Sequence, residues 1–230
     1  MGLHNLTVLF QITAFLLSFI LSFFIFIPLA VNQYRFNAHC LLYASGHWNT
    51  SDISQLTDIT WGPNSACGFG LFIGIVLMLV TLFYICLDAL HLFRETESSW
   101  LDSMLTGLVS LVLMLMLFSE SITISVGFKE WCNLLTNPPS EITSCELAEY
   151  VTFYSEDKIN INNFYTHMKM AEFGSWSNFI CWLFLFVTSF YKLVRYQRHE
   201  TFMASVNRER ERLVQKFGPR NRAEYMPVPT

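Results

Sequence analysis

The sequence predicts an all-α membrane protein: a bundle of four transmembrane helices with two disulfide-held extracellular loops. Three observations support this fold class. Four long apolar runs divide the chain, and 53% of all residues are hydrophobic while only 14% are charged. Two pairs of cysteines fall in the first and third gaps between the runs, which face the same side of a membrane. Each run has the roughly 20 residues that a helix needs to cross about 30 Å of hydrocarbon.

The apolar runs favour helices over a transmembrane β-barrel. Barrel strands alternate apolar and polar residues over about ten positions, whereas the stretch from Leu71 to Leu87 is continuously apolar. Helices also satisfy every backbone amide within their own segment, as lipid requires. We therefore expect a membrane domain over residues 1–195, with helices at 6–30, 68–90, 103–128 and 171–194, outer loops at 31–67 and 129–170, and a cytoplasmic tail at 196–230.

The first run is expected to be an uncleaved signal anchor. Its apolar stretch, from Leu6 to Ala30, is longer than the core of a secretory signal peptide, and no basic segment precedes it. The helix should therefore remain in the protein as the first of the four membrane crossings.

The first outer loop contains Cys40, Cys67 and a glycosylation sequon at Asn49. Cysteine pairs outside the cytosol oxidise and persist as disulfides, and a sequon exposed there can accept a glycan. The segment from Cys40 to Tyr43 could form a short strand, which would add a small β element to the outer loops.

The third run contains one charged residue, Glu120, within an apolar helix. A carboxylate inside the membrane is costly and raises the question of function. Three interpretations remain open: binding of a cation or proton, pairing with a partner's transmembrane helix, or satisfaction by the neighbouring hydroxyl groups and interfacial water. The second run offers Gly68, Gly70 and Gly74 for close helix packing, either within the bundle or between subunits.

The second outer loop contains Cys132 and Cys145 and an excess of carboxylates over lysines. We interpret the carboxylates as a solvated loop surface, with recruitment of a basic partner or of calcium as the alternatives. Four outer cysteines allow three pairings, and pairing within each loop is the simplest. The two remaining cysteines, Cys86 and Cys181, lie in apolar runs and are expected to be small buried residues.

The distribution of basic residues predicts the orientation. Lysine and arginine are retained on the cytoplasmic side, and most of them follow the fourth run, from Lys192 to Arg222. Both termini should therefore be cytoplasmic and both cysteine-bearing loops should lie outside. We expect the tail at 196–230 to be helical and then disordered. Its end matches a tyrosine-based sorting motif through Tyr225 and Val228.

The sequence predicts neither an enzyme nor a cofactor site. It contains no phosphate-binding loop, no nucleophile elbow and no HExxH zinc motif. The six histidines are scattered over both sides of the membrane. No metal site, no cofactor and no nucleic-acid partner are therefore expected, and membrane lipid is the one certain contact of such a chain.

Several sequence blocks together resemble the transmembrane protein 179 family. These blocks are IPL at 27–29, HCLLY at 39–43, WGPNSAC at 61–67, SVGFKEWC at 125–132, SCEL at 144–147 and NFYTHMKMAEFGSW at 163–176. The resemblance spans the chain from the first run to the fourth, although the tail matches poorly and Glu120 departs from the family pattern. It implies four membrane passes and a bias to excitable tissue, but no settled activity. More broadly, the architecture resembles claudin-like tetraspans, whose W-GLW-C-C signature is not intact here.

By analogy with claudin-like folds, we expect a non-enzymatic accessory or trafficking subunit of a larger membrane protein, such as a channel or receptor. A small transporter or oligomeric channel that uses Glu120 is one alternative. A self-associating adhesive or scaffolding tetraspan, and thus a homo-oligomer, is the other. The expected location is the plasma membrane or secretory and endosomal vesicles.

Overall fold

The computed structural model contains four long helices, one two-stranded sheet and one short 3-10 helix. It describes residues 2–48, 56–94, 100–138, 140, 142–150 and 159–217. The helices are α1 (Gly2–Arg35), α2 (Asn64–Arg94), α3 (Trp100–Thr136) and α4 (Phe164–Phe217). Each of the four is long and apolar enough to cross a membrane. The predicted fold class, a four-helix membrane bundle with two disulfides and a small β element, is confirmed.

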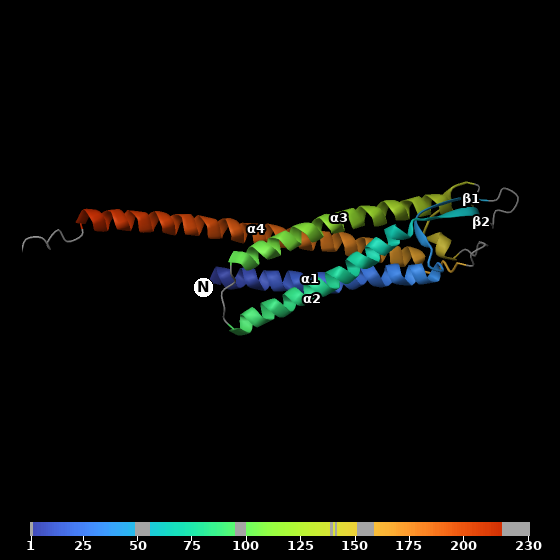
Figure 1. Cartoon of the computed structure of the whole chain (residues 1–230). Coiled ribbons are helices and arrows are strands. Elements are labelled where there is room, and N and C mark those ends of the chain that lie inside the picture. Colours follow the sequence, from blue (N-terminus) through green and yellow to red (C-terminus); the bar gives the residue numbers. More distant parts are fainter. Residues whose placement is uncertain are drawn as a thin grey trace, which may run out of the picture.

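The helices lie side by side in the order α2, α1, α4, α3 (Figure 1). α1 packs against both α2 and α4, and α3 packs against α4, whereas α2 makes few contacts with α3. The sheet and both disulfides lie at one end of the bundle, which we call the hairpin end. The N-terminus lies at the opposite end, the tail end, where α4 projects well beyond the other three helices (Figure 1).

All four helices extend past the spans expected from hydropathy. α1 continues through Arg35, α3 continues through Thr136, and α4 begins at Phe164, so each adds a turn or more at the hairpin end. The loops between them are correspondingly shorter than expected. α4 also continues through residue 195 without a break, so the expected domain boundary does not end a helix. Hydropathy measures the hydrocarbon span, whereas backbone hydrogen bonding extends a helix beyond it.

The sheet pairs β1 (Cys40–Trp48) with β2 (Leu56–Gly62) in antiparallel register. Cys40 lies opposite Gly62 and Trp48 lies opposite Leu56, with two irregularities in the register between them. β1 packs along α3, and its side chains at Cys40, Leu41 and Leu42 are buried. The hairpin is thus one face of a packed unit that includes the end of α3.

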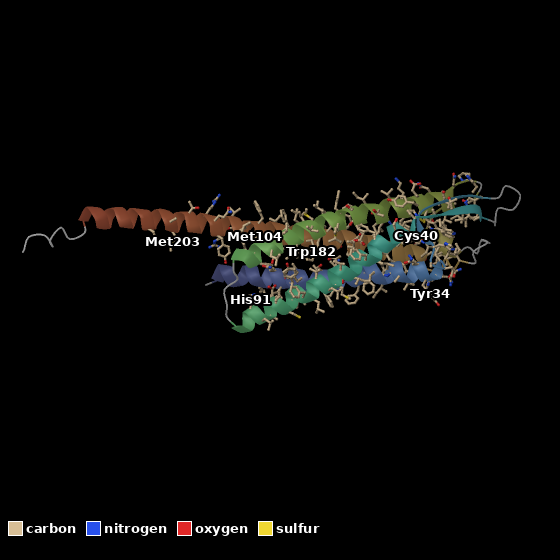
Figure 2. All side chains as sticks on the ribbon, viewed as in Figure 1. Tyr34, Cys40, His91, Met104, Trp182 and Met203 are labelled. Atoms are coloured by element: carbon tan, nitrogen blue, oxygen red, sulfur yellow. A yellow bond between two sulfur atoms is a disulfide. The ribbon has the colours of Figure 1, made fainter. Side chains whose placement is uncertain are left out.

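Aromatic side chains close the interior of the bundle toward the tail end. Phe15 of α1 stacks on Tyr84 of α2 with ring centroids 5.0 Å apart. Trp182 of α4 meets the same Phe15 edge-on at 6.0 Å, and Figure 2 shows Trp182 between the helices near the middle of the bundle. Three helices are therefore locked together by rings, which bury a large apolar area in a fixed geometry.

Two of the three glycines expected to allow close packing do so within this bundle. A Cβ atom at Gly74 would lie 2.7 Å from the Cβ of Phe26 and 3.2 Å from its backbone nitrogen. At Gly70 it would meet Leu29 at 2.7 Å, whereas at Gly68 it would meet nothing within 4 Å. α1 and α2 therefore approach closely at Gly74, because a side chain there would force their backbones apart.

We expect Gly74→Ala to destabilise the bundle by about 1–3 kcal/mol, the range for overpacking a well-packed core. The matched control is Gly68→Ala, which adds the same methyl group to the same helix in open space. The measurement is the melting temperature of each purified variant in detergent, followed by circular dichroism at 222 nm. Equal melting temperatures for the two variants would contradict the close α1–α2 approach.

Candidate functional site

Four segments of the chain meet in an aromatic cluster at the hairpin end. Trp131 of α3 lies at its centre with no exposed surface. Its ring lies 5.8 Å from Phe36, just after α1, 5.9 Å from Trp61 of β2 and 6.4 Å from Phe164 of α4. His39 stacks on the outer side of Trp61 at 5.0 Å. We call this cluster and the sheet, the two disulfides and the 3-10 helix η1 (Leu147–Tyr150) that surround it the hairpin-end module.

Each disulfide of the module joins two cysteines of the same loop. Cys40 of β1 is bonded to Cys67 in the first turn of α2. Cys132 of α3 is bonded to Cys145, which precedes η1. The simplest of the three possible pairings is therefore the one in the structure, and it fastens the hairpin to α2 and the second loop to α3. Of the other cysteines, Cys181 is buried as expected, but Cys86 is exposed on α2, so the expectation of burial was wrong there.

A polar junction connects the second loop to α1 and α4. The Oδ1 atom of Asn32 lies 3.2 Å from Nδ1 of His167, and the Arg35 guanidinium donates to the carbonyl of Asn162. The backbone amide of Thr166 donates to Oε1 of Glu149 at 2.9 Å. Glu149 therefore accepts one of the amide protons that the first turn of a helix leaves unpaired, and its charge favours the positive end of α4.

Glu149 corrects the interpretation of the second loop as a solvated acidic surface. Its side chain is only 7% exposed, unlike Glu130 and Glu146, which are exposed. The sequence offered no signal for this difference, because the partner of Glu149 lies 17 residues away at the start of α4.

Glu120 of α3 points into the bundle. It has no exposed surface, and neither carboxylate oxygen has a hydrogen-bond partner among the described residues. A Cβ atom at Gly70 of α2 would lie 3.4 Å from its Oε1 and 2.7 Å from Cδ1 of Leu29, so Gly70 allows α2 to lie close to the carboxyl group. The neighbouring hydroxyls of Ser119 and Thr123 donate to backbone carbonyls of their own helix instead.

The structure bears on two of the three interpretations of Glu120. The hydroxyl groups of Ser119 and Thr123 donate to backbone carbonyls and not to the carboxyl group, which faces the bundle interior and not lipid. An intramembrane acid that faces the bundle interior is the arrangement found where such residues act. All three interpretations stay predictions.

Three other pairs of polar residues make structural contacts between α1 and α4. Oγ of Ser18 donates to Oδ1 of Asn178 at 2.6 Å and accepts from Nε1 of Trp182 at 2.9 Å. Nζ of Lys192 donates to Oε1 of Gln11 at 2.5 Å. Such bonds hold transmembrane helices together because an unmade bond is costly in lipid. The sequence alone does not indicate which of these polar residues are partners.

Three predicted site residues lie outside the described part of the chain. They are the glycosylation acceptor Asn49 and the sorting-motif residues Tyr225 and Val228. Within the described ranges, no group of three or more histidine, cysteine, aspartate or glutamate residues is arranged to hold a metal ion.

Comparison with known proteins gives two findings. Residues 7–214 match the family model described as the transmembrane protein 179/179B claudin domain. A transmembrane protein 179B from Danio rerio is 29% identical to this chain over 174 residues, which cover 74% of each protein. No solved structure matches the chain. The matched residues include all of α2 and α3, most of α1 and α4, and the hairpin-end module.

Proposed function

Because the chain belongs to the transmembrane protein 179/179B claudin family, we propose that it acts as a non-enzymatic accessory or trafficking subunit of a larger membrane protein, such as a channel or receptor. The hairpin-end module is the observation that supports this role. Two disulfides and one aromatic cluster hold the module rigid, and a preorganised surface loses little entropy when a partner binds.

We propose that the hairpin-end module faces the cell exterior or a vesicle lumen and that both termini lie in the cytoplasm. The basic residues that follow the membrane span of α4, beginning with Arg195 and Arg198, support this orientation. Oxidised cysteines also persist on that side of the membrane. The proposed location is the plasma membrane or secretory and endosomal vesicles, where such an orientation places the cysteine-bearing loops in an oxidising space.

A specific observation favours one alternative function. The buried carboxyl group of Glu120 would suit a small transporter or oligomeric channel. The rings of Phe15, Tyr84 and Trp182 count against a pathway through a single bundle, because they fill its interior between Glu120 and the tail end. The accessory role is therefore the better-supported function.

Photocrosslinking tests the accessory role. Tyr150 in the hairpin-end module is 80% exposed and Tyr191 on α4 is 63% exposed, so each can be replaced by benzoylphenylalanine with little disturbance of the fold. We expect irradiation of cells to link the full chain to one defined membrane protein from position 150, and not from position 191. A product with a second copy of the chain would instead favour the self-associating tetraspan. The absence of any specific product from position 150 would contradict the accessory role.

The variant Glu120→Gln separates the accessory role from the transporter. An accessory subunit should keep its crosslinked product from position 150, because Glu120 lies inside the bundle and away from the module surface. Proton or cation flux into liposomes that contain the purified protein gives the second measurement. Flux that the unsubstituted protein supports and Glu120→Gln abolishes would overturn the accessory role in favour of transport.

A further inference from the structure

A groove opens between β1 and the end of α3, within the hairpin-end module. Its cavity volume is about 470 Å³, and Ser45 and Gly46 of β1 line one side. Glu130 and Asn133 of α3 line the other, and Asn137, just after α3, closes the end. A volume of this size lies within the roughly 300–1,000 Å³ range of known ligand sites.

The walls of the groove are held in place by contacts on both sides. Nε1 of Trp48, at the end of β1, donates to the carbonyl of Leu134 in α3 at 2.9 Å. Oγ of Ser140 donates to the carbonyl of Leu135 at 2.8 Å. The Cys132–Cys145 disulfide holds the segment after α3 against the same helix. The groove is therefore a fixed feature of the module.

The groove carries a negative potential. It lies at the carboxyl end of α3, a helix of 37 residues whose last turn contains no basic side chain. Such an end carries a fractional negative charge because its last carbonyl groups lack helical partners, although Trp48 and Ser140 donate to two of them. The exposed carboxylate of Glu130 adds a full negative charge in the groove wall. Lys129, the adjacent cation, does not line the groove.

The lining also accepts the stem of a long side chain. Ala44, Leu134 and Pro138 give it an apolar part, and Ser45, Asn133 and Asn137 give it hydrogen-bond acceptors. Lysine and arginine combine an apolar stem with a cationic head in this way. A divalent metal ion suits the groove less well, because such ions need several oxygen ligands and Glu130 is the one carboxylate in the lining.

We propose that this groove receives a lysine or arginine side chain from the partner's segment on the same side of the membrane. The inference rests on the proposed accessory function and identifies its point of contact. Glu130 pairs with the cationic head, the end of α3 adds to the attraction, and the apolar lining covers the stem.

Binding of a model peptide tests the charge preference of the groove. The probe is acetyl-(Arg-Gly)3-amide, titrated by microscale thermophoresis onto the labelled full-length protein in detergent at low salt. We expect Glu130→Gln to weaken binding at least fivefold. Glu146→Gln, which removes an exposed charge from the loop after α3 and outside the groove, should weaken it less than twofold. Asn133→Lys places a cation within the groove, where it competes with the peptide's arginine for Glu130. This variant should therefore weaken binding more than Glu130→Gln does.

Two results of this titration would overturn the proposal. One is the absence of binding to the unsubstituted protein. The other is an equal loss with Glu130→Gln and Glu146→Gln, which would indicate diffuse attraction to an acidic surface. Folding of each variant is checked by its melting temperature. This should stay near that of the unsubstituted protein, because the side chains of Glu130 and Asn133 are exposed.

Crosslinking from position 150 distinguishes failure of the groove from failure of the accessory function. Loss of the product in Glu130→Gln, with retention in Glu146→Gln, supports both proposals. Retention of the product in both variants overturns the groove proposal and leaves the accessory function standing. Absence of the product in the unsubstituted chain overturns the accessory function, while the peptide titration still decides the preference of the groove.

Discussion

Replacing Trp131 with alanine is expected to destabilise the protein by about 3–5 kcal/mol, the range for truncating a buried tryptophan. Trp131 is fully buried, and its ring contacts Phe36, Trp61 and Phe164 from three other segments. Its removal would leave a cavity that these rings cannot fill, because each belongs to a different segment: Phe36 follows α1, Trp61 lies in β2 and Phe164 begins α4. The segments that carry these rings would then lose the side chain against which all of them pack.

The measurement is the melting temperature in detergent, followed by circular dichroism. A loss of 3–5 kcal/mol corresponds to a decrease of roughly 6 °C or more for a protein of this size. Trp176→Ala is the matched control, since Trp176 is only partly buried and packs at the side of the bundle against Phe118 and Phe179. Trp131→Phe should recover part of the loss. Equal melting temperatures for Trp131→Ala and Trp176→Ala would contradict a central role for Trp131.

The number of membrane-spanning helices and the two loops that carry the disulfides could be predicted from the sequence. Hydropathy identifies a transmembrane helix because the hydrocarbon region accepts long apolar segments whose backbone hydrogen bonds are all made internally. The direction in which a residue of such a run faces could not be predicted in the same way. α3 is apolar on its lipid face and on its core face alike, so its residues carry no 3.6-residue period that marks the interior. The inward direction of Glu120 therefore had to come from the packed structure.

Pairs of distant polar residues were the other feature that sequence could not provide. Ser18 and Asn178 are 160 residues apart, and Asn32 and His167 are 135 residues apart. Each residue could be recognised as polar, but its partner depends on the register between α1 and α4. The four loop cysteines were an exception, because they allow only three pairings and the simplest, within each loop, is the one in the structure.

Removing the Cys40–Cys67 disulfide is expected to destabilise the protein by about 3.5 kcal/mol, and removing Cys132–Cys145 by about 2.9 kcal/mol, from the entropy of closing each loop. The two bonds enclose sequence separations of 27 and 13 residues. The larger loss should therefore follow from Cys40→Ala with Cys67→Ala. That bond also fastens β1 to α2, a helix whose remaining contacts are mainly with α1.

The comparison of the two double variants under non-reducing conditions tests this order. Both should melt below the unsubstituted protein, with Cys40→Ala/Cys67→Ala lower than Cys132→Ala/Cys145→Ala. A reductant should lower the melting temperature of the unsubstituted protein further than that of either variant, because it breaks both bonds at once. The reverse order would mean that native contacts of the second loop, such as Glu149 with the start of α4, depend on the Cys132–Cys145 bond more than loop entropy predicts. In that case the Cys132→Ala/Cys145→Ala variant should also lose binding of the arginine peptide, because Cys132 lies in the part of α3 that forms one wall of the groove.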